Sequence, residues 1–512
     1  MLNAPIPFAA ALAPWLEGAA ARLETVPELA QLLASQARAE LVAGLAQELA
    51  AVTAQTLLER FLHHPGRWPS PRSRVAHDQF VGRLLAGAMD RLLSELPVLA
   101  QIIEQVIDAW FARVSRMVGR VARDRNHLDQ FSVRPPFARA VAPMDTVVEL
   151  ADASGVCVLY KDRPLGMDAA FCELLRWINA QGPRCPLLIP GVVDRGAYGW
   201  MAYVPERPAS GPADRRAYLT RAGMLACLVH AIGGGDVHAG NVRACGEHPV
   251  IIDGEVLLRP RRAGHDDPSP AALATGWLPS AHEVERCGLL AGLWQDRQRR
   301  WSHVGTDAIR QRPLRSPLAP IRPEIVRHFR GMLGAGTAQL CAGFAEMYAL
   351  IAARGLPLEV FAQSRPRVLL RTSYLYQETI ERSLQPAALS SAGDRAALID
   401  RLVRRVPLAL EAQPVADAVA DAERSAMLAL AVPRFTTSAT GRELFIGGTL
   451  LGTPFRESPI ERAHRFIASM SPSAMEAQCR VIAAAIAAVA AGSLEPAAWQ
   501  MEILPRFDVE AR

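Results

Sequence analysis

The chain has 512 residues, of which 50% are hydrophobic and 21% are charged. This composition is typical of a globular protein with roughly two to four structural units, and it excludes a largely disordered chain. The formal net charge is +5, and no basic stripe is interleaved with aromatic residues, so we expect no nucleic-acid partner.

Three features bear on the compartment. The eight cysteines are scattered without a Cys-x-x-Cys pair or a Cys–His cluster, which favours reduced thiols in the cytoplasm and argues against structural zinc. The N-terminal apolar run has no basic residues before it, so it indicates a helix and not a secretory signal. The late apolar run at 481–494 is shorter than the roughly 20 residues of a membrane span. We therefore expect a cytoplasmic protein with no membrane span.

The first third of the chain is predicted to be helical. From about residue 10 to 130 the apolar residues recur three and four positions apart, as in amphipathic helices. The proline-rich, non-periodic stretch 132–145 indicates a boundary. After it the pattern predicts two strands, 146–151 and 156–161, joined by a turn, and then a helix at 169–180.

The rest of the chain is predicted as a mixed segment followed by helices. Strand candidates lie at 187–194 and 198–204, a helix at 220–232 and a further strand at 249–258. From 268 onward helices dominate, interrupted by prolines and by a loop at 435–448. The expected order is a helical block, a mixed α+β core and a second helical block.

The stretch IGGGDVHAGNVRACGEHPVIIDGEVLL carries the clearest chemical pattern. Asp236, His238 and Asn241 form an Asp-x-His-x-x-Asn motif, and Asp253 and Glu255 follow at the end of a β-rich run. Phosphoryl transfer from ATP needs such a layout, because one Asp accepts the proton of the attacking hydroxyl while an Asn and a second Asp hold Mg²⁺. Each part alone also occurs as a helix cap or a solvated turn; together they predict a phosphotransferase that uses ATP and Mg²⁺.

Lys161, in GVCVLYKDRPLG, is the only lysine among the 56 Lys and Arg residues. It ends the predicted strand 156–161, where protein kinases place the lysine that pairs with the nucleotide phosphates. A compact ammonium is not replaceable at such a site by a wider, planar guanidinium. By itself the residue could also be an exposed edge lysine. Its place upstream of the two motifs predicts a phosphate-binding role.

The chain resembles the dehydratase domain of class II lanthipeptide synthetases (LanM type). The catalytic run is also similar to small-molecule kinases of the aminoglycoside and choline type and to lipid-kinase-like enzymes. The stretches that select the LanM type match in order and spacing from about residue 75 to 490: LYKDRPL, AYGWMAYV, YLTRAGMLACLVHAI, CGEHPVIIDGEVLLRP and RPRVLLRTSYLYQETIERSLQP.

The resemblance implies an α+β fold, a kinase-like (lipid-kinase-like) bilobal core with helical elaborations at both ends. The expected regions are an N-terminal helical region at 1–131, the catalytic core at 132–265, a helical region with an arginine-rich segment at 266–390, and a C-terminal helical region at 391–512.

The activity that the resemblance implies is peptide Ser/Thr dehydration in lanthipeptide (RiPP) biosynthesis, in two steps. ATP and Mg²⁺ first serve to phosphorylate Ser or Thr of a precursor peptide with a leader, and phosphate is then eliminated to give dehydroalanine or dehydrobutyrine. Carried over by motif, Lys161 contacts the phosphates, Asp236 and His238 serve the hydroxyl and the transition state, and Asn241 and Asp253, with Glu255 nearby, bind the metal.

The elimination residues implied by the resemblance are Arg367, Arg371 and Ser373. The last stands where the family usually has Thr, and Thr372 stands where proline is usual. The family's Gly-Asp-x-His loop falls at 138–144, which here reads ARAVAPM without acid or histidine. One contact to nucleotide or substrate is therefore missing or supplied elsewhere.

Two further departures concern the lysine motif and the cyclase. The family's Tyr-Lys-Pro-Arg is Tyr-Lys-Asp-Arg here, so Asp162 either tunes the pairing of Lys161 or faces solvent. The family's C-terminal cyclase pattern does not appear before Arg512. We therefore expect a stand-alone dehydratase, with ring formation left to a separate cyclase or other modifying enzyme.

Two alternatives stay open at this point. One is a kinase that phosphorylates a peptide or a small molecule without elimination, which would follow if the arginine-rich segment lies away from Asp236. The other is a family member that binds a precursor peptide or a partner enzyme without catalysis, which the missing Gly-Asp-x-His loop suggests. The intact motif residues argue against it: Lys161, Asp236, Asn241 and Asp253.

Overall fold

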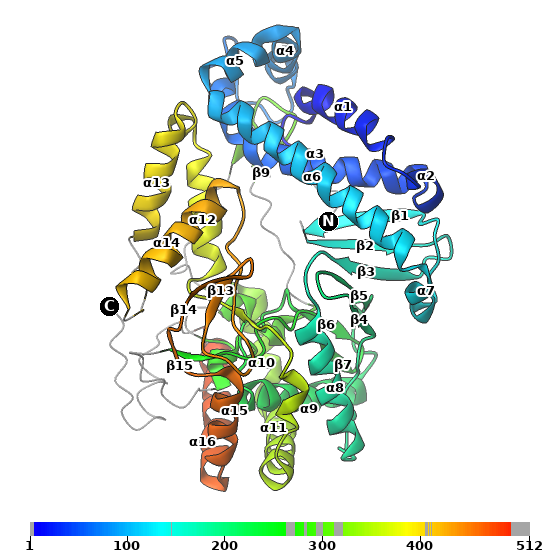
Figure 1. Ribbon diagram of the computed structural model, residues 1–512, viewed down its shortest axis with the longest axis vertical. Helices are drawn as coiled ribbons and strands as arrows, with labels where there is room; N and C mark the ends of the chain where they lie inside the picture. The colour runs from blue at the N-terminus through cyan, green and yellow to red at the C-terminus, as the bar shows by residue number, and fades with distance from the viewer. Residues whose placement is uncertain are drawn as a thin grey trace.

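The computed structural model describes residues 5–144, 146–262, 272–280, 284–292, 301–311, 321–404, 408, 410 and 412–492. They form a mixed fold of many helices and small antiparallel sheets, which confirms the expected α+β class. In Figure 1 an N-terminal helical unit lies above a five-stranded sheet, and the remaining helices lie below that sheet and to one side of it.

The N-terminal unit is built on two long helices that pack against each other, α3 (Ser35–Leu62) and α6 (Pro97–Arg123). α6 buries residues three or four positions apart, among them Ile102, Val106 and Trp110, as its sequence period predicts. Shorter helices complete the unit: α1 (Ala13–Leu23), α2 (Leu29–Leu32), α4 (Val75–Arg83), α5 (Met89–Glu95) and α7 (Arg125–Leu128).

The five-stranded sheet has the order β1-β2-β3-β5-β4. The two predicted strands are confirmed as β2 and β3, and the predicted helix at 169–180 is confirmed as α8 (Gly166–Ala180). The stretch interpreted as a boundary also contains β1, whose Ala140 N–H donates to Glu40 of α3 at 3.0 Å. The strands are β1 (Arg139–Met144), β2 (Val147–Ala151), β3 (Cys157–Lys161), β4 (Val192–Asp194) and β5 (Gly199–Ala202).

Below the sheet, α9 (Pro212–Ala231) and α11 (Ala335–Arg354) cross with their backbones in close approach. A Cβ added at Gly223 would lie 2.0 Å from the carbonyl oxygen of Leu340, and one added at Gly343 would lie 2.0 Å from that of Thr220. Only glycine fits at both positions. The neighbouring helices are α10 (Pro323–Met332), α15 (Pro459–Ala468) and α16 (Pro472–Ala490).

A short hairpin of β6 (Val242–Cys245) and β7 (His248–Ile251) follows α9. The strand predicted at 249–258 is wrong beyond Ile251. Glycine at position 254 and a turn that Leu257 N closes on the Gly254 carbonyl at 3.2 Å end the ladder there, so the acidic residues lie in a loop.

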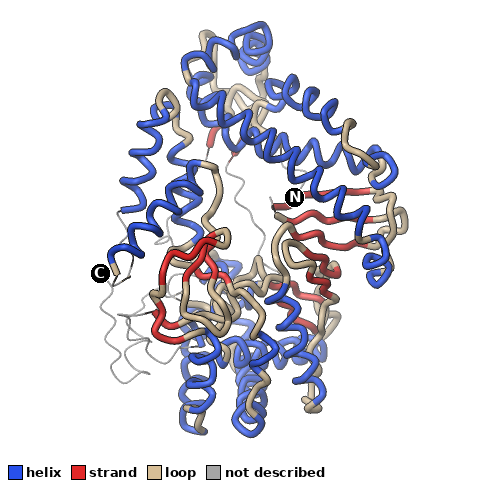
Figure 2. Tube along the Cα trace, in the orientation of Figure 1, coloured by secondary structure: helices blue, strands red, loops and turns tan. Residues whose placement is uncertain are grey.

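The C-terminal part is less helical than its sequence suggests. The loop predicted at 435–448 contains two strands, and the glycines at 447 and 448, with φ of 54° and 88°, turn the chain into the next strand. Figure 2 shows this four-stranded sheet apart from the five-stranded one. Its order is β11 (Arg367–Val368), β12 (Phe435–Thr436), β13 (Leu444–Ile446) and β14 (Thr449–Gly452).

This four-stranded sheet, the C-terminal sheet, is flanked by three helices, α12 (Ser373–Ser383), α13 (Ala392–Arg404) and α14 (Gln413–Leu428). Besides the β6–β7 hairpin, two pairs of short strands connect loops within the described residues. They are β8 (Arg261–Arg262) with β15 (Phe455–Glu457), and β9 (Trp301–Ser302) with β10 (Arg310–Gln311).

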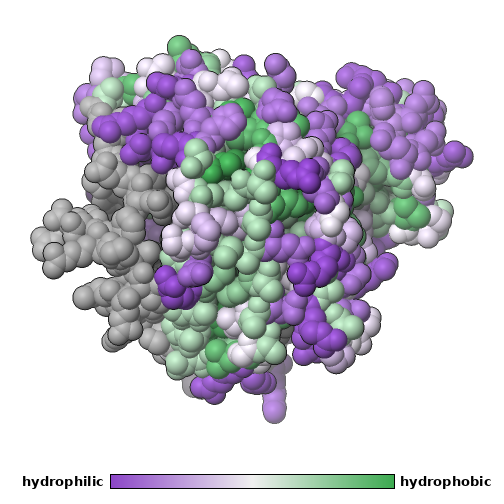
Figure 3. Space-filling model, turned by 90° about the horizontal axis from the view of Figure 1, so that it is seen from below, coloured by the Kyte–Doolittle hydropathy of each residue, from purple (hydrophilic) through white to green (hydrophobic). Residues whose placement is uncertain are grey.

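Two of the described helices, α3 and α16, are long and apolar enough to cross a membrane by length and composition alone. The same test is passed by core helices of folded proteins, and α16 packs against α10 and α11 while α3 packs against α6 and β1. The end of the molecule at which α11 and α16 point downward in Figure 1 shows hydrophilic residues beside weakly apolar ones (Figure 3). The absence of a membrane span stays a prediction.

Candidate active site

Two loops form the centre of the site, the DxHxxN loop (residues 236–241) and the DGE turn (residues 253–255). The backbone N–H of Gly235 donates to Val256 O at 3.1 Å, and that of Ile252 donates to Asn241 O at 2.9 Å. Because these bonds join both ends of the two segments, the motifs face each other. A Cβ added at Gly234 would lie 2.9 Å from Leu257 O, which accounts for a glycine before the loop.

The DxHxxN loop is held by its own polar groups. Asp236 adopts a left-handed backbone with φ of 61°, a conformation that is strained for a residue with a side chain and that is common at functional sites. Asn241 Nδ2 donates to the Asp236 carbonyl oxygen at 2.8 Å. One short loop thus presents the carboxylate of Asp236 and the side-chain amide oxygen of Asn241.

His238 is a neutral imidazole at pH 7. Burial, and then the charge of Arg286, lower the pKa of His238 to about 4. Its Nδ1 accepts the N–H of Gly240 at 3.1 Å, which assigns the ring proton to Nε2. The Nε2 atom lies 3.8 Å from Oδ1 of Asp236. His238 therefore presents an N–H donor beside the carboxylate of the DxHxxN loop.

Lys161 reaches the DGE turn from the five-stranded sheet. It is the last residue of β3, only 3% of its surface is exposed, and its Nζ donates to the carbonyl oxygen of Ile252. Burial lowers the pKa of Lys161, while the charges of Asp168 and Asp253 oppose that shift. The solitary lysine thus lies directly against the residue that precedes the predicted metal ligand.

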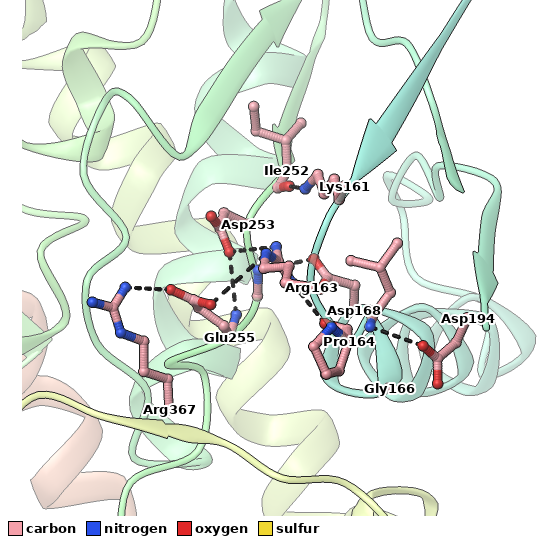
Figure 4. Close-up of polar contacts among 12 residues, drawn as sticks. Lys161, Arg163, Pro164, Gly166, Asp168, Asp194, Ile252, Asp253, Glu255 and Arg367 are labelled. Atoms are coloured by element: carbon pink, nitrogen blue, oxygen red, sulfur yellow. Dashed lines mark hydrogen bonds and ion pairs between the residues drawn. The ribbon is translucent and has the colours of Figure 1, made fainter. Parts of the chain in front are cut away.

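Arg163 and Asp168 are site residues that the sequence analysis did not assign. Arg163 Nη1 donates to Asp168 Oδ2 at 2.8 Å, and its Nη2 donates to Asp253 Oδ1 at 2.7 Å (Figure 4). Asp168 Oδ1 in turn accepts the N–H of Gly254 at 3.1 Å. A signal existed in the sequence, because Asp168 is an acidic residue in the first turn of α8, most of which is apolar.

This buried pair is strongly ionised. Burial by itself would raise the pKa of the Asp168 carboxyl. The positive charges of Arg163 and Lys161 outweigh the effect of burial and hold that pKa below its usual value. Burial by itself would lower the pKa of Arg163. The negative charges of three carboxylates outweigh the effect of burial and raise that pKa; they are Asp168, Asp253 and Glu255. The pair links the end of β3 and the start of α8 to the DGE turn.

Glu255 faces arginines. Arg367 Nη1 donates to its Oε1 at 2.5 Å, Arg434 Nη2 lies 2.8 Å from its Oε2, and Arg163 Nε lies 3.8 Å from the same oxygen. Burial alone would raise the pKa of Glu255, and the three guanidinium groups lower it instead. At Asp253, burial prevails over Arg163 and the pKa is raised.

The predicted elimination residues are placed differently from one another. The backbone N–H of Arg367 donates to Glu255 O at 2.7 Å, so β11 lies beside the DGE turn. Arg371 Nε donates to Glu423 Oε1 of α14 at 2.8 Å, and both side chains are buried. Ser373 is the first residue of α12 and is half-buried. The structure thus brings Arg367 to the site, and the roles of Arg371 and Ser373 stay predictions.

Asp162 binds the N-terminal unit. Its two carboxylate oxygens contact Arg116 at 2.9 Å and Arg120 at 2.5 Å, both on α6. Asp162 is thus directed toward α6, whereas the Lys161 amine contacts the carbonyl oxygen of Ile252. The sequence analysis expected Asp162 either to tune Lys161 or to face solvent, and neither holds. Asp162 instead connects the end of β3 to α6 through its ion pairs.

Asn241 and Asp253 carry oxygen atoms of the kind that Mg²⁺ takes as ligands, and their binding of the metal stays a prediction. Mg²⁺ takes oxygen ligands and is held by one or two carboxylates plus substrate phosphates rather than by a closed protein cage. Within the residues that the structure describes, no group of three or more His, Cys, Asp or Glu is arranged as such a cage. Glu255 is engaged by arginines, so its metal ligation stays a prediction.

Comparison with known proteins matches most of the chain to one family. Residues 96–438 match the model of a family described as a domain of unknown function (DUF4135). The lacticin 481/lactococcin biosynthesis protein LcnDR2 of Lactococcus lactis subsp. lactis is 22% identical over 187 residues, which cover 33% of this chain. The match spans 20% of that relative's length.

Proposed function

The chain belongs to the DUF4135 family, and we propose that it is a peptide Ser/Thr dehydratase that acts in lanthipeptide maturation. A relative is named for the biosynthesis of lacticin 481, which supports a precursor peptide as the substrate. The reaction has two steps, phosphorylation of Ser or Thr with ATP and Mg²⁺ and elimination of the phosphate.

The observation that carries the proposal is the meeting of three separate segments at one point. Lys161 of the sheet contacts Ile252 O, and the DxHxxN loop is bonded to the same segment through Asn241 O. A lysine on a strand, an Asp-x-His-x-x-Asn loop and an acidic turn in this contact form the arrangement that phosphoryl transfer requires. A kinase-like bilobal core, with the sheet as the upper lobe in Figure 1, is part of the proposal.

In the first step, Asp236 orients the substrate hydroxyl and accepts its proton, while Lys161 contacts the phosphates. The hydroxyl oxygen forms a bond to the γ-phosphorus of ATP, the bond from that phosphorus to the β-phosphate oxygen breaks, and ADP leaves. Asn241 and Asp253 would hold the metal. When bound, Mg²⁺ neutralises charge on the transferred phosphoryl group. His238 donates from Nε2, because its Nδ1 is occupied by Gly240 N–H and its lowered pKa keeps the ring neutral.

In the second step, the substrate loses its α-proton and the phosphate ester. The electron pair of the Cα–H bond becomes the Cα=Cβ bond, the Cβ–O bond breaks, and its pair leaves with inorganic phosphate while the proton passes to a base of the site or to water. Arg367 lies at the DGE turn, where a cation stabilises the charge that builds up on the departing phosphate.

The test is mass spectrometry of the precursor peptide encoded beside the gene, incubated with the protein, ATP and Mg²⁺. Loss of one water per modified residue is expected. A phosphate gain that never converts into water loss would instead make the protein a kinase, and an unchanged peptide that still binds would make it a peptide-binding protein. A Lys161→Arg protein is the control for the first step.

A further inference from the structure

Glu255 holds two guanidinium groups that come from distant parts of the chain. Arg367 lies in β11, and Arg434 directly precedes β12. The two strands pair antiparallel with Arg367 opposite Thr436 and Val368 opposite Phe435. Arg434 therefore lies two positions along the ladder from Arg367, and side chains two positions apart point to the same face of a sheet. Arg367 takes one carboxylate oxygen of Glu255 and Arg434 lies 2.8 Å from the other.

The two arginines are more exposed to solvent than the carboxylate of Glu255 between them. The side chain of Glu255 is 10% exposed, that of Arg367 is 17% exposed and that of Arg434 is 35% exposed. The carboxylate therefore lies beneath the two cations. A guanidinium has five N–H donors, and one contact to Glu255 leaves most of those of Arg434 for another acceptor.

Three guanidinium groups lie around the carboxylate of Glu255, those of Arg163, Arg367 and Arg434. Arg163 is also paired with Asp168 and Asp253, at 2.8 and 2.7 Å, so its charge is compensated within the site. An anion beside Arg434 and Arg367 would accept from the remaining N–H donors of these two residues, and guanidinium groups bind phosphate through such charge-assisted hydrogen bonds.

We propose that Arg434 and Arg367 form a subsite for the phosphate ester of the phosphorylated peptide, and that Glu255 is the positioning residue that holds the two arginines side by side. The inference rests on the proposed function. In the elimination step the Cβ–O bond breaks and its electron pair leaves with phosphate, so the subsite binds the leaving group. Nucleotide phosphates in the first step are served by Lys161 and the metal instead.

The experiment separates the two steps by supplying the phosphorylated intermediate. The precursor peptide encoded beside the gene is synthesised with one phosphoserine and incubated with the wild type, Arg434→Gln and Arg434→Lys. Loss of phosphate is expected to slow by about tenfold or more in Arg434→Gln, because a charge-assisted contact is lost. Arg434→Lys, which keeps the charge without the fork, should lie between the two.

The matched control is Arg442→Gln, at an exposed arginine that lies beyond the same β12 strand and pairs with Glu461 at the surface. It is expected to eliminate phosphate at the wild-type rate. Phosphorylation of the unmodified peptide by Arg434→Gln should stay within about threefold of the wild type, since the arginine serves the second step. Equal thermal midpoints of all variants establish that they are folded.

Glu255→Gln tests the positioning role against metal ligation. A positioning role predicts slow elimination with an unchanged Mg²⁺ concentration dependence of phosphorylation. A raised Mg²⁺ requirement would make Glu255 a metal ligand and overturn that part of the inference. If the wild type eliminates phosphate and Arg434→Gln does so equally fast, the subsite is wrong while the proposed function stands. If the wild type neither phosphorylates nor eliminates, the proposed function itself is wrong.

Discussion

The replacement Asp168→Asn removes one charge from the buried centre of the site while keeping the shape of the side chain. In the wild type the side chains of Asp168 and Arg163 are 2% and 5% exposed and lie 2.8 Å apart. Loss of one partner of a buried ion pair costs about 3–5 kcal/mol. We expect a value near the lower end, about 3 kcal/mol, because Arg163 keeps its bond to Asp253.

Chemical denaturation measures this cost, with a surface pair as the control. Glu95→Gln removes the partner of Arg60, and those side chains are 58% and 47% exposed, so the expected loss is below about 1 kcal/mol. A double-mutant cycle of Asp168→Asn with Arg163→Gln isolates the pair. A coupling free energy near zero, or equal losses for Asp168→Asn and Glu95→Gln, would refute the assignment of this pair as a link between the sheet and the DGE turn.

The pH dependence gives the same prediction a second readout. The pKa of Asp168 is lowered in the folded protein, so its contribution is fully present above the unfolded pKa of about 4 and is lost as the pH falls through the lower folded pKa. The difference in unfolding free energy between the wild type and Asp168→Asn should therefore be constant between about pH 5 and 8. A difference that already vanishes near neutral pH would contradict the charge assignment.

Three further predictions follow from the structure. Lys161→Arg should slow phosphorylation by about 10- to 100-fold, since a guanidinium is too wide for the buried contact to Ile252 O; ADP release measures this, and a wild-type rate would contradict it. The pKa of His238 is lowered from 6.5 to about 4, so between these values the unfolded chain binds a proton that the folded one does not. From pH 7.5 to 5.5 the wild type should therefore lose about 1 kcal/mol more stability than His238→Gln, as denaturation curves at the two pH values would show; equal losses would refute the neutral assignment. Gly223→Ala should cost about 1–3 kcal/mol by overpacking, because its Cβ would meet Leu340 O at 2.0 Å; an unchanged thermal midpoint would show that the crossing of α9 and α11 can relax.

Local structure near the site could be predicted from the sequence. The strand expected at 156–161 is β3, and the helices expected at 169–180 and 220–232 correspond to α8 and to the second half of α9. The α8 helix was predictable because burial of one face leaves a period in the sequence, whereas β3 and the second half of α9 are almost wholly buried and show up as apolar runs. The limits of β7 and the strands β12 and β13 were missed, since short strands next to glycine-rich turns leave almost no period.

The sequence also determined in part which residues form the candidate site. The order of Lys161, the DxHxxN loop and the DGE turn predicted that they serve one reaction, and their contacts through Ile252 and Asn241 place them at one site. Short motifs carry this information because a single loop or turn presents its side chains in a geometry set mostly by the local backbone.

Only the tertiary structure decided the ion pairs. Arg163 and Asp168 come from one segment and Arg434 from a distant one, and they meet at the DGE turn. Arg371 instead pairs with Glu423 of α14, and Asp162 pairs with α6. A sequence period shows that a side chain is buried, but it does not show against what. The energy of two charges depends on their distance and on the water excluded around them, and both are set by the packing of the sheets and helices on one another.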